Sequence, residues 1–260
     1  MARSKKAGEW IAFIAGIGLI LALIQAGNIL QGKRAIFPPA GETVRAFFDL
    51  LCRKETYARI GTTLLHTAEA TAVSVAAGML LGLAEALIPY LHSLLRPLHA
   101  LLRSMPMILL AMIMLMATRF SKEWMPLLTG CLVLIPMISE AGYEGCRRID
   151  GDLIDVYRLD RRMSPGIILH VYLPLTSGYM KQALVNACGM GLKVIVTAEY
   201  LVHTANSMGQ TVYLKLDALE YAEVFAWALI MVLLVLVLTG IPAALIRLAG
   251  KQKKGEITSG

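Results

Sequence analysis

The segment that decides the fold is residues 224–246, VFAWALIMVLLVLVLTGIPAALI, a run of 23 residues without a charge. A helix rises about 1.5 Å per residue, so this run extends about 34 Å and can cross the roughly 30 Å hydrocarbon core of a bilayer. A soluble fold would interrupt so long a run with a polar face. The segment therefore predicts a transmembrane helix.

Five more apolar blocks precede this segment. They cover residues 10–32, 62–87, 104–118, 124–143 and 183–202. The composition agrees with a membrane protein, because 57% of the residues are hydrophobic and only 17% are charged, whereas soluble domains are about one quarter charged. We therefore expect an all-α polytopic membrane protein with six transmembrane helices.

The first block has a second interpretation, because Arg3, Lys5 and Lys6 precede it as in a secretory signal peptide. The block is long, however, and no small-x-small cleavage site follows it, which favours an uncleaved span. The polar stretch that follows, up to Arg59, is long enough for a short amphipathic helix outside the membrane. We expect three parts: this N-terminal part (1–60), a transmembrane domain (61–248) and a cytoplasmic tail (249–260).

The basic residues indicate the orientation of the chain. Six spans place both termini on one side; if that side is the cytoplasm, 15 Lys and Arg residues lie inside, nine lie outside, and Lys193 lies within a span. A cytoplasmic excess of basic residues is the usual bias of membrane proteins. The net charge of +7 thus indicates topology rather than nucleic-acid binding, because the basic residues are not interleaved with stacking aromatic residues.

The patterns that metal and disulfide chemistry require are missing from the sequence. The four cysteines are widely spaced and form no CxxC pair, and no HExxH motif occurs. The 14 methionines include a cluster over residues 105–116, which favours adaptable packing over metal ligation. We expect neither a metal nor a cofactor in this chain.

Glu140, Lys193 and Glu199 are charged residues within apolar blocks. A lysine that faces lipid at the bilayer centre costs about 2.5–3.5 kcal/mol, so Lys193 should face protein or water. Lys193 and Glu199 lie about 120° apart around a helix, so a direct pair is not expected. Each either lines a translocation path, or is satisfied by a neighbouring helix or reaches toward the membrane interface. For Glu199, near the outer end of its span, a role outside the path is favoured. Glu140 fits an inner gate or a subunit contact, and His66 with Glu69 fits a pair at the membrane interface.

The segment 145–180 is the least ordinary part of the chain, because it combines charges of both signs between two spans. Within it, residues 153–159 (LIDVYRL) place apolar side chains at helical spacing, and 164–166 (SPG) end any helix. A short helix parallel to the membrane fits this pattern, and its apolar side requires a partner. Periodicity alone fits a solvated connecting loop equally well.

This loop resembles the signature of the permease subunits of bacterial ABC importers: Glu-Ala-Ala, three residues, Gly, nine residues, then Ile-x-Leu-Pro. Here 155–157 (DVY) occupy the first place, Arg161 takes the glycine's place, and 171–174 (VYLP) form the last element. The spacing fits without a gap, although several residue types differ. Arg161 is the largest departure, because a glycine accepts a positive φ at no cost and an arginine does not.

The resemblance extends over residues 62–246. Other residues in the order and spacing of the family are Pro97, Arg103, Pro106, Pro136, Gly145, Lys193 and Glu199. They are similar to one branch of the family, the nitrate, aliphatic sulfonate and taurine permeases, with relatives thought to carry thiamine precursors or bicarbonate.

The resemblance implies a type I ABC importer permease in the bacterial inner membrane, with both termini cytoplasmic. A homodimer of this chain would bind two copies of a separate ATPase, and an external or periplasmic substrate-binding protein would deliver a small solute. ATP and Mg²⁺ would bind to the ATPase, so this chain would not be an enzyme. From the residues alone, a secondary transporter or an intramembrane enzyme is the alternative.

The resemblance also implies site residues, because the family's loop forms a coupling helix that docks on the ATPase. The expected coupling residues are Leu153, Asp155, Val156, Tyr157, Arg158, Leu159, Asp160, Arg161, Leu173 and Pro174. The residues expected along the translocation path or at its gate are Met105, Pro106, Glu140, Lys193 and Glu199.

Overall fold

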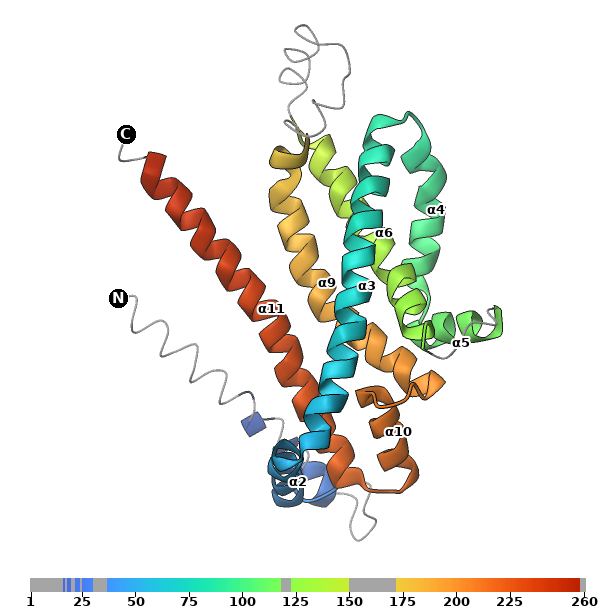
Figure 1. The fold of residues 1–260 in the computed structure, drawn as a ribbon, viewed down its shortest axis with the longest axis vertical. Helices are drawn as coiled ribbons and strands as arrows, with labels where there is room; N and C mark the ends of the chain where they lie inside the picture. The colour runs from blue at the N-terminus through green and yellow to red at the C-terminus, as the bar shows by residue number, and fades with distance from the viewer. Residues whose placement is uncertain are drawn as a thin grey trace, which may run out of the picture. The chain divides into compact units, whose positions relative to one another are not determined.

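The computed structural model describes residues 37–117, 123–149 and 172–257, together with residues 16, 18–19, 22–23 and 25–29 of the first apolar block. The long elements in these ranges are all helices (Figure 1). They are α2 (Ala40–Cys52), α3 (Lys54–Leu87), α4 (Leu91–Ser104), α5 (Met107–Ala117), α6 (Met125–Arg147), α9 (Leu173–Val202), α10 (Met208–Asp217) and α11 (Tyr221–Ile257). The all-α expectation is confirmed.

Four of these helices are long and apolar enough to cross a membrane, namely α3, α6, α9 and α11. The bent pair of α4 and α5 makes a fifth crossing if it counts as one span. The first apolar block lies largely outside the described residues, so the expected count of six is neither reached nor contradicted. Helix α2 lies where the sequence predicts a short amphipathic helix.

The chain divides into two compact units. The smaller unit comprises residues 1–58 and 211–232, and the larger comprises residues 59–210 and 233–260. In the smaller unit, the Arg53 guanidinium lies 3.1 Å from the Glu223 carboxylate. The Lys215 ammonium donates to Glu220 at 2.6 Å and lies 3.1 Å from Glu223. These two carboxylates, Glu220 first, raise the pKa of Lys215 above its ordinary value.

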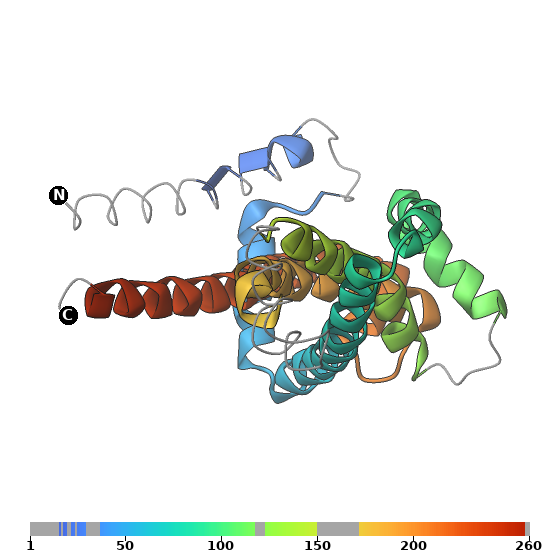
Figure 2. The ribbon, with the colours of Figure 1, turned by 90° about the horizontal axis from the view of Figure 1, so that it is seen from above.

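In the larger unit, α3, α6 and α9 lie side by side (Figures 1 and 2). Their shared core includes Leu134 and Ile138 of α6 and Ala187 of α9, all fully or almost fully buried. A second cluster joins Leu110 of α5 to Val133 and Val194. These contacts are close-packed, which makes the three helices a rigid frame for the polar groups described below.

Helices α3 and α6 run parallel and in very close contact, because glycines remove side chains from their interface. A Cβ at Gly78 would lie 2.8 Å from the Cβ of Ile138, and a Cβ at Gly82 would lie 2.3 Å from the Ser139 carbonyl oxygen. Gly78 and Gly82 form the small-xxx-small spacing that brings membrane helices together. The Ala- and Gly-rich composition of residues 62–87 predicts this contact, and the structure confirms it.

We predict that Gly82→Ala destabilises the protein, because the new methyl group meets the backbone of α6. Overpacking of this kind costs about 1–3 kcal/mol. The matched control is Gly61→Ala in the same helix, where nothing lies within 4 Å of the added Cβ and alanine should stabilise the helix by up to about 1 kcal/mol. Thermal unfolding in detergent should therefore shift in opposite directions for the two variants. Equal melting temperatures would contradict this packing.

The predicted third span, residues 104–118, is wrong as a single helix. Helix α4 ends at Ser104, Met105 is extended (φ −69°, ψ 135°), and α5 starts at Met107. The two helices meet at 105°. The cause is Pro106, which disfavours the helical conformation of the residue before it. With 11 residues, α5 extends only about 16 Å, too little to cross the hydrocarbon alone.

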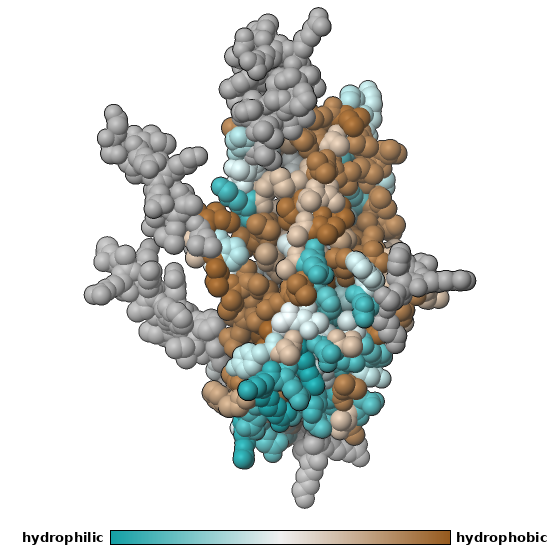
Figure 3. All heavy atoms as spheres, viewed as in Figure 1, coloured by the Kyte–Doolittle hydropathy of each residue, from teal (hydrophilic) through white to brown (hydrophobic). Residues whose placement is uncertain are grey.

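Large apolar side chains lie on the outside of the molecule, as a lipid environment requires. Leu80 of α3 is 70% exposed and Leu94 of α4 is 72% exposed. Figure 3 shows that apolar residues cover most of the upper part of the visible face, over α4 and the C-terminal part of α3. Contiguous patches of this extent are rare on monomeric soluble proteins and mark a surface that another apolar medium covers.

Candidate functional site

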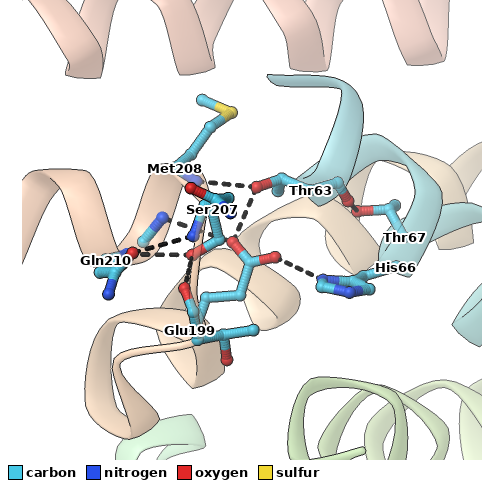
Figure 4. A network of polar contacts seen from close by, with 10 residues as sticks. Thr63, His66, Thr67, Glu199, Ser207, Met208 and Gln210 are labelled. Atoms are coloured by element: carbon cyan, nitrogen blue, oxygen red, sulfur yellow. Dashed lines mark hydrogen bonds and ion pairs between the residues drawn. The ribbon is translucent and has the colours of Figure 1, made fainter. Parts of the chain in front are cut away.

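The carboxylate of Glu199 is the centre of a buried polar network between α9 and α3 (Figure 4). Its side chain is fully buried. The Thr63 hydroxyl donates to Oε2 at 2.8 Å, and Nδ1 of His66 lies 2.8 Å from Oε1. The backbone N–H of Gly209 approaches Oε2 at 3.3 Å. The carboxylate of Glu199 therefore connects α9 to both α3 and the first turn of α10.

The backbone after α9 is shaped to bring these groups together. His203 ends the helix in the left-handed region (φ 57°), and the N–H of Thr204 donates to the carbonyl of Glu199 at 3.1 Å. The chain then reverses, and the N–H of Met208 donates to Thr63 Oγ1 at 3.0 Å. Only a glycine fits at position 209, because a Cβ there would lie 2.5 Å from the Cβ of Glu199.

A neighbouring helix thus satisfies Glu199, which is one of the two roles outside the path that the sequence left open. The expected partner of His66 was Glu69, three residues away, but the structure pairs His66 with Glu199 instead. The reason is burial: a carboxylate that is removed from water requires hydrogen-bond donors, whereas an exposed pair within one helix adds little. Glu199 is therefore an anchor that fixes α9 against α3.

Lys193 lies in a different environment, on an exposed face of α9. Among the described residues, no carboxylate pairs with its ammonium. Gln182 and Asn186 are also exposed and bond to each other at 3.2 Å. Thr197 is half-buried and donates to the Lys193 carbonyl at 2.8 Å. These four residues fall within about 60° around the helix, so α9 carries one polar stripe through an apolar span.

Glu140 of α6 forms an ion pair with Arg103 of α4. Both side chains are partly exposed, so the pair joins the two helices near the surface. Met105 and Met107 lie on one wall of a cavity of about 210 Å³, which also includes Arg103 and the α9 residue Met190. Pro106 forms the bend between α4 and α5, as described above.

A second buried carboxylate, which was not predicted from the sequence, is Glu85 near the end of α3. Its side chain is fully buried; it accepts a hydrogen bond from the Ser139 hydroxyl at 2.5 Å and lies 2.8 Å from Nδ1 of His92. Nε2 of His99 lies 3.7 Å from the same carboxylate. The His92 ring stacks on Tyr143, with 3.7 Å between ring centroids. The helical spacing of His92, Arg96, His99 and Arg103 is visible in the sequence and could have indicated this cluster.

Most of the expected coupling residues, 153–161, lie outside the described residues. Of the remaining two, Leu173 is the first residue of α9 and Pro174 is the second. Pro174 is exposed, in the first turn where proline fits a helix best. The coupling role of all these residues stays a prediction.

Comparisons with known proteins agree with this architecture. The family described as "Binding-protein-dependent transport system inner membrane component" matches residues 74–251. No curated protein matches the chain at a significant level. The solved structures that are similar at low sequence identity include three of ABC transporters, and likenesses at this level concern the fold.

The first is the MetNI methionine ABC transporter in an inward-facing form, with 17% identity, a TM-score of 0.58, and coverage of 81% of this chain and 97% of that chain. The second is a bacterial ABC transporter involved in import of the acidic polysaccharide alginate, with 15% identity, a TM-score of 0.65, and coverage of 92% and 98%. The third is a bacterial alginate ABC transporter in complex with an alginate pentasaccharide-bound periplasmic protein, with 14% identity, a TM-score of 0.61, and coverage of 91% and 93%.

Proposed function

This chain belongs to the family of binding-protein-dependent transport system inner membrane components, and from that premise we propose that it forms the translocation path of an ATP-driven importer. Two copies pair in the bacterial inner membrane, with both termini in the cytoplasm. Two ATPase subunits bind on the cytoplasmic side, and a substrate-binding protein delivers a small solute from outside. The residue pattern resembles that of the nitrate, sulfonate and taurine branch of the family.

The observation that carries this proposal is the polar stripe on α9. Its lysine is exposed and without a partner among the described residues, yet it lies within an apolar span of 29 residues. A lysine in contact with lipid there would cost about 2.5–3.5 kcal/mol, so this face must meet water or another protein. A water-filled path between two copies of the chain provides both.

The gate and the coupling loop complete the proposed mechanism. The Arg103–Glu140 pair joins α4 to α6 and lies beside the cavity of about 210 Å³ that Met105 lines. A small tilt between these helices would therefore open or close that cavity. The loop between α6 and α9 transmits the movement of the ATPase to both helices. Because cores of packed helices have discrete arrangements, a docking movement changes access in one step.

Reconstitution in proteoliposomes tests this function. The purified chain, the ATPase and the binding protein should together take up the solute that co-purifies with the binding protein. Uptake should stop when ATP or the ATPase is omitted. Uptake driven by an ion gradient without the ATPase would favour a secondary transporter, and chemical conversion of the solute by this chain alone would favour an intramembrane enzyme; either result would overturn the proposal.

A further inference from the structure

Helix α4 has an unusual distribution of residues for a membrane helix. Its basic residues lie at positions i, i+4, i+7 and i+11 and share one face; they are His92, Arg96, His99 and Arg103. The opposite face carries Leu94, Leu98 and Leu101, each at least 48% exposed. On the basic face, His92, His99 and Arg103 contact Glu85 or Glu140 of α3 and α6, whereas Arg96 is exposed. The apolar face turns outward.

A cavity of about 130 Å³ lies along this basic face. Its lining consists of His92, Arg96, His99, Ala100, Arg103 and Glu140. The volume is far above the roughly 10–15 Å³ that a single water requires. Ala100, one turn beyond Arg96, contributes only a methyl group and so leaves room beside the guanidinium.

The basic residues around this cavity are not all paired with a carboxylate. Arg103 is paired with Glu140, and His92 is paired with Glu85. Arg96 has no carboxylate partner among the described residues. The His99 side chain is 7% exposed, and its Nε2 is 3.7 Å from Glu85, beyond hydrogen-bond distance. The guanidinium of Arg96, which has no carboxylate partner among the described residues, and the imidazole of His99, whose contact with Glu85 is long, thus line the same space.

We infer that this cavity, named here the α4 hollow, binds an organic oxyanion. A planar guanidinium binds carboxylate, sulfonate or phosphate groups through two parallel hydrogen bonds, and the Nδ1–H tautomer of His99 supplies a further donor on the side away from Glu85. Arg103 also lines the adjoining cavity of about 210 Å³, whose other residues are Leu102, Met105, Met107, Val133, Met137 and Met190. An oxyanion head in the α4 hollow can therefore extend a short apolar body into the adjoining cavity.

The inference rests on the proposed function for its physiological meaning. The α4 hollow lies near the end of the helices from which the predicted coupling loop departs, since Leu87 of α3 packs with Cys146 and Tyr172. Its occupant would then be the imported solute on the cytoplasmic half of its path. A water-soluble anion is favoured over a lipid headgroup, because the lipid-exposed leucines lie on the opposite face of α4.

Calorimetry on the purified chain in neutral phosphatidylcholine nanodiscs tests the inference without an ATPase. Butyrate should bind and butyramide, which has the same shape without the charge, should bind at least tenfold more weakly. From acetate to hexanoate, affinity should rise by about fourfold for each methylene that enters the adjoining cavity. Empty nanodiscs correct for partition of the probes into lipid.

Variants locate the site. Arg96→Gln should weaken butyrate binding tenfold or more, and His99→Gln should weaken it less. Arg45→Gln, which removes an exposed arginine from α2, should leave it unchanged. Thermal unfolding checks that each variant is folded. Equal affinity for butyrate and butyramide, or an Arg96→Gln variant that binds butyrate like the unchanged protein, would overturn the inference even if ATP-driven uptake is observed.

A titration in a second lipid distinguishes a soluble organic anion from a lipid headgroup as the source of the bound oxyanion. The same titration in nanodiscs that contain phosphatidylglycerol should give butyrate affinity within twofold of the neutral value. Loss of butyrate binding in phosphatidylglycerol, restored by dilution with neutral lipid, would assign the α4 hollow to a headgroup and overturn the assignment to a soluble organic anion.

Discussion

Glu199→Ala is expected to destabilise the protein by about 3–5 kcal/mol, the cost of removing one partner from a buried ionic network. The alanine leaves the Thr63 hydroxyl, the His66 ring and the Gly209 N–H without their acceptor. Thr63 and Gly209 are buried and cannot turn to water, whereas the His66 side chain is 17% exposed. Thermal unfolding and protease resistance in detergent should both show the loss.

Two further variants make this prediction specific to the buried network. Glu199→Gln retains an oxygen that accepts from Thr63, so it should cost less than the alanine variant. Glu220→Ala removes a carboxylate whose side chain is 48% exposed and bonded to Lys215; pairs of this kind contribute about 1 kcal/mol or less. Equal melting temperatures for Glu199→Ala and Glu220→Ala would show that Glu199 does not anchor α9 to α3.

The second large effect is expected in the loop between α6 and α9. We predict that Asp155→Ala with Arg158→Ala removes ATPase binding and lowers ATP-driven uptake more than tenfold, with no change in the melting temperature of the isolated chain. The charges fix the register of a docking surface, and the apolar residues beside them supply most of its contact energy. Co-purification of the ATPase with the permease measures the loss directly.

A matched pair of substitutions tests whether position or only charge matters. Arg45→Ala with Asp49→Ala changes the same charges on exposed positions of α2, which we place on the outer side of the membrane. This variant should retain full ATPase binding. If the loop variant binds the ATPase as strongly as the α2 variant does, the docking surface lies elsewhere.

The long spans could be predicted from the sequence because they depend only on the length and apolar composition of a continuous segment. Residues 224–246 and 62–87 are too apolar and too long for any other environment, and helices α11 and α3 contain them. The glycines of α3 were a second local signal, since small residues at a spacing of four predict close helix contact. The loop signature before Leu173 and Pro174 predicted the family for the same reason.

The polar contacts of Glu199 could not be predicted, because its partners on α3 are distant in the chain. Glu199 bonds to His66 across 133 residues, and nothing in a single sequence connects the two. Glu85 appeared to be the end of a span, although Ser139 and two histidines surround it. The bend at Pro106 was locally encoded, but hydrophobicity alone suggested a continuous span there. Tertiary pairing therefore decides what the intramembrane charges do.

The central claim is that the loop after α6 lies in the cytoplasm and is covered by a separate ATPase. Its most direct measurement is the labelling of an Arg161→Cys variant, in a background without the four native cysteines, with a membrane-impermeant maleimide. We predict no labelling in intact cells, labelling in inverted membrane vesicles, and protection in those vesicles when the ATPase is bound. Labelling from outside intact cells would place the loop on the wrong side of the membrane and contradict the proposed coupling.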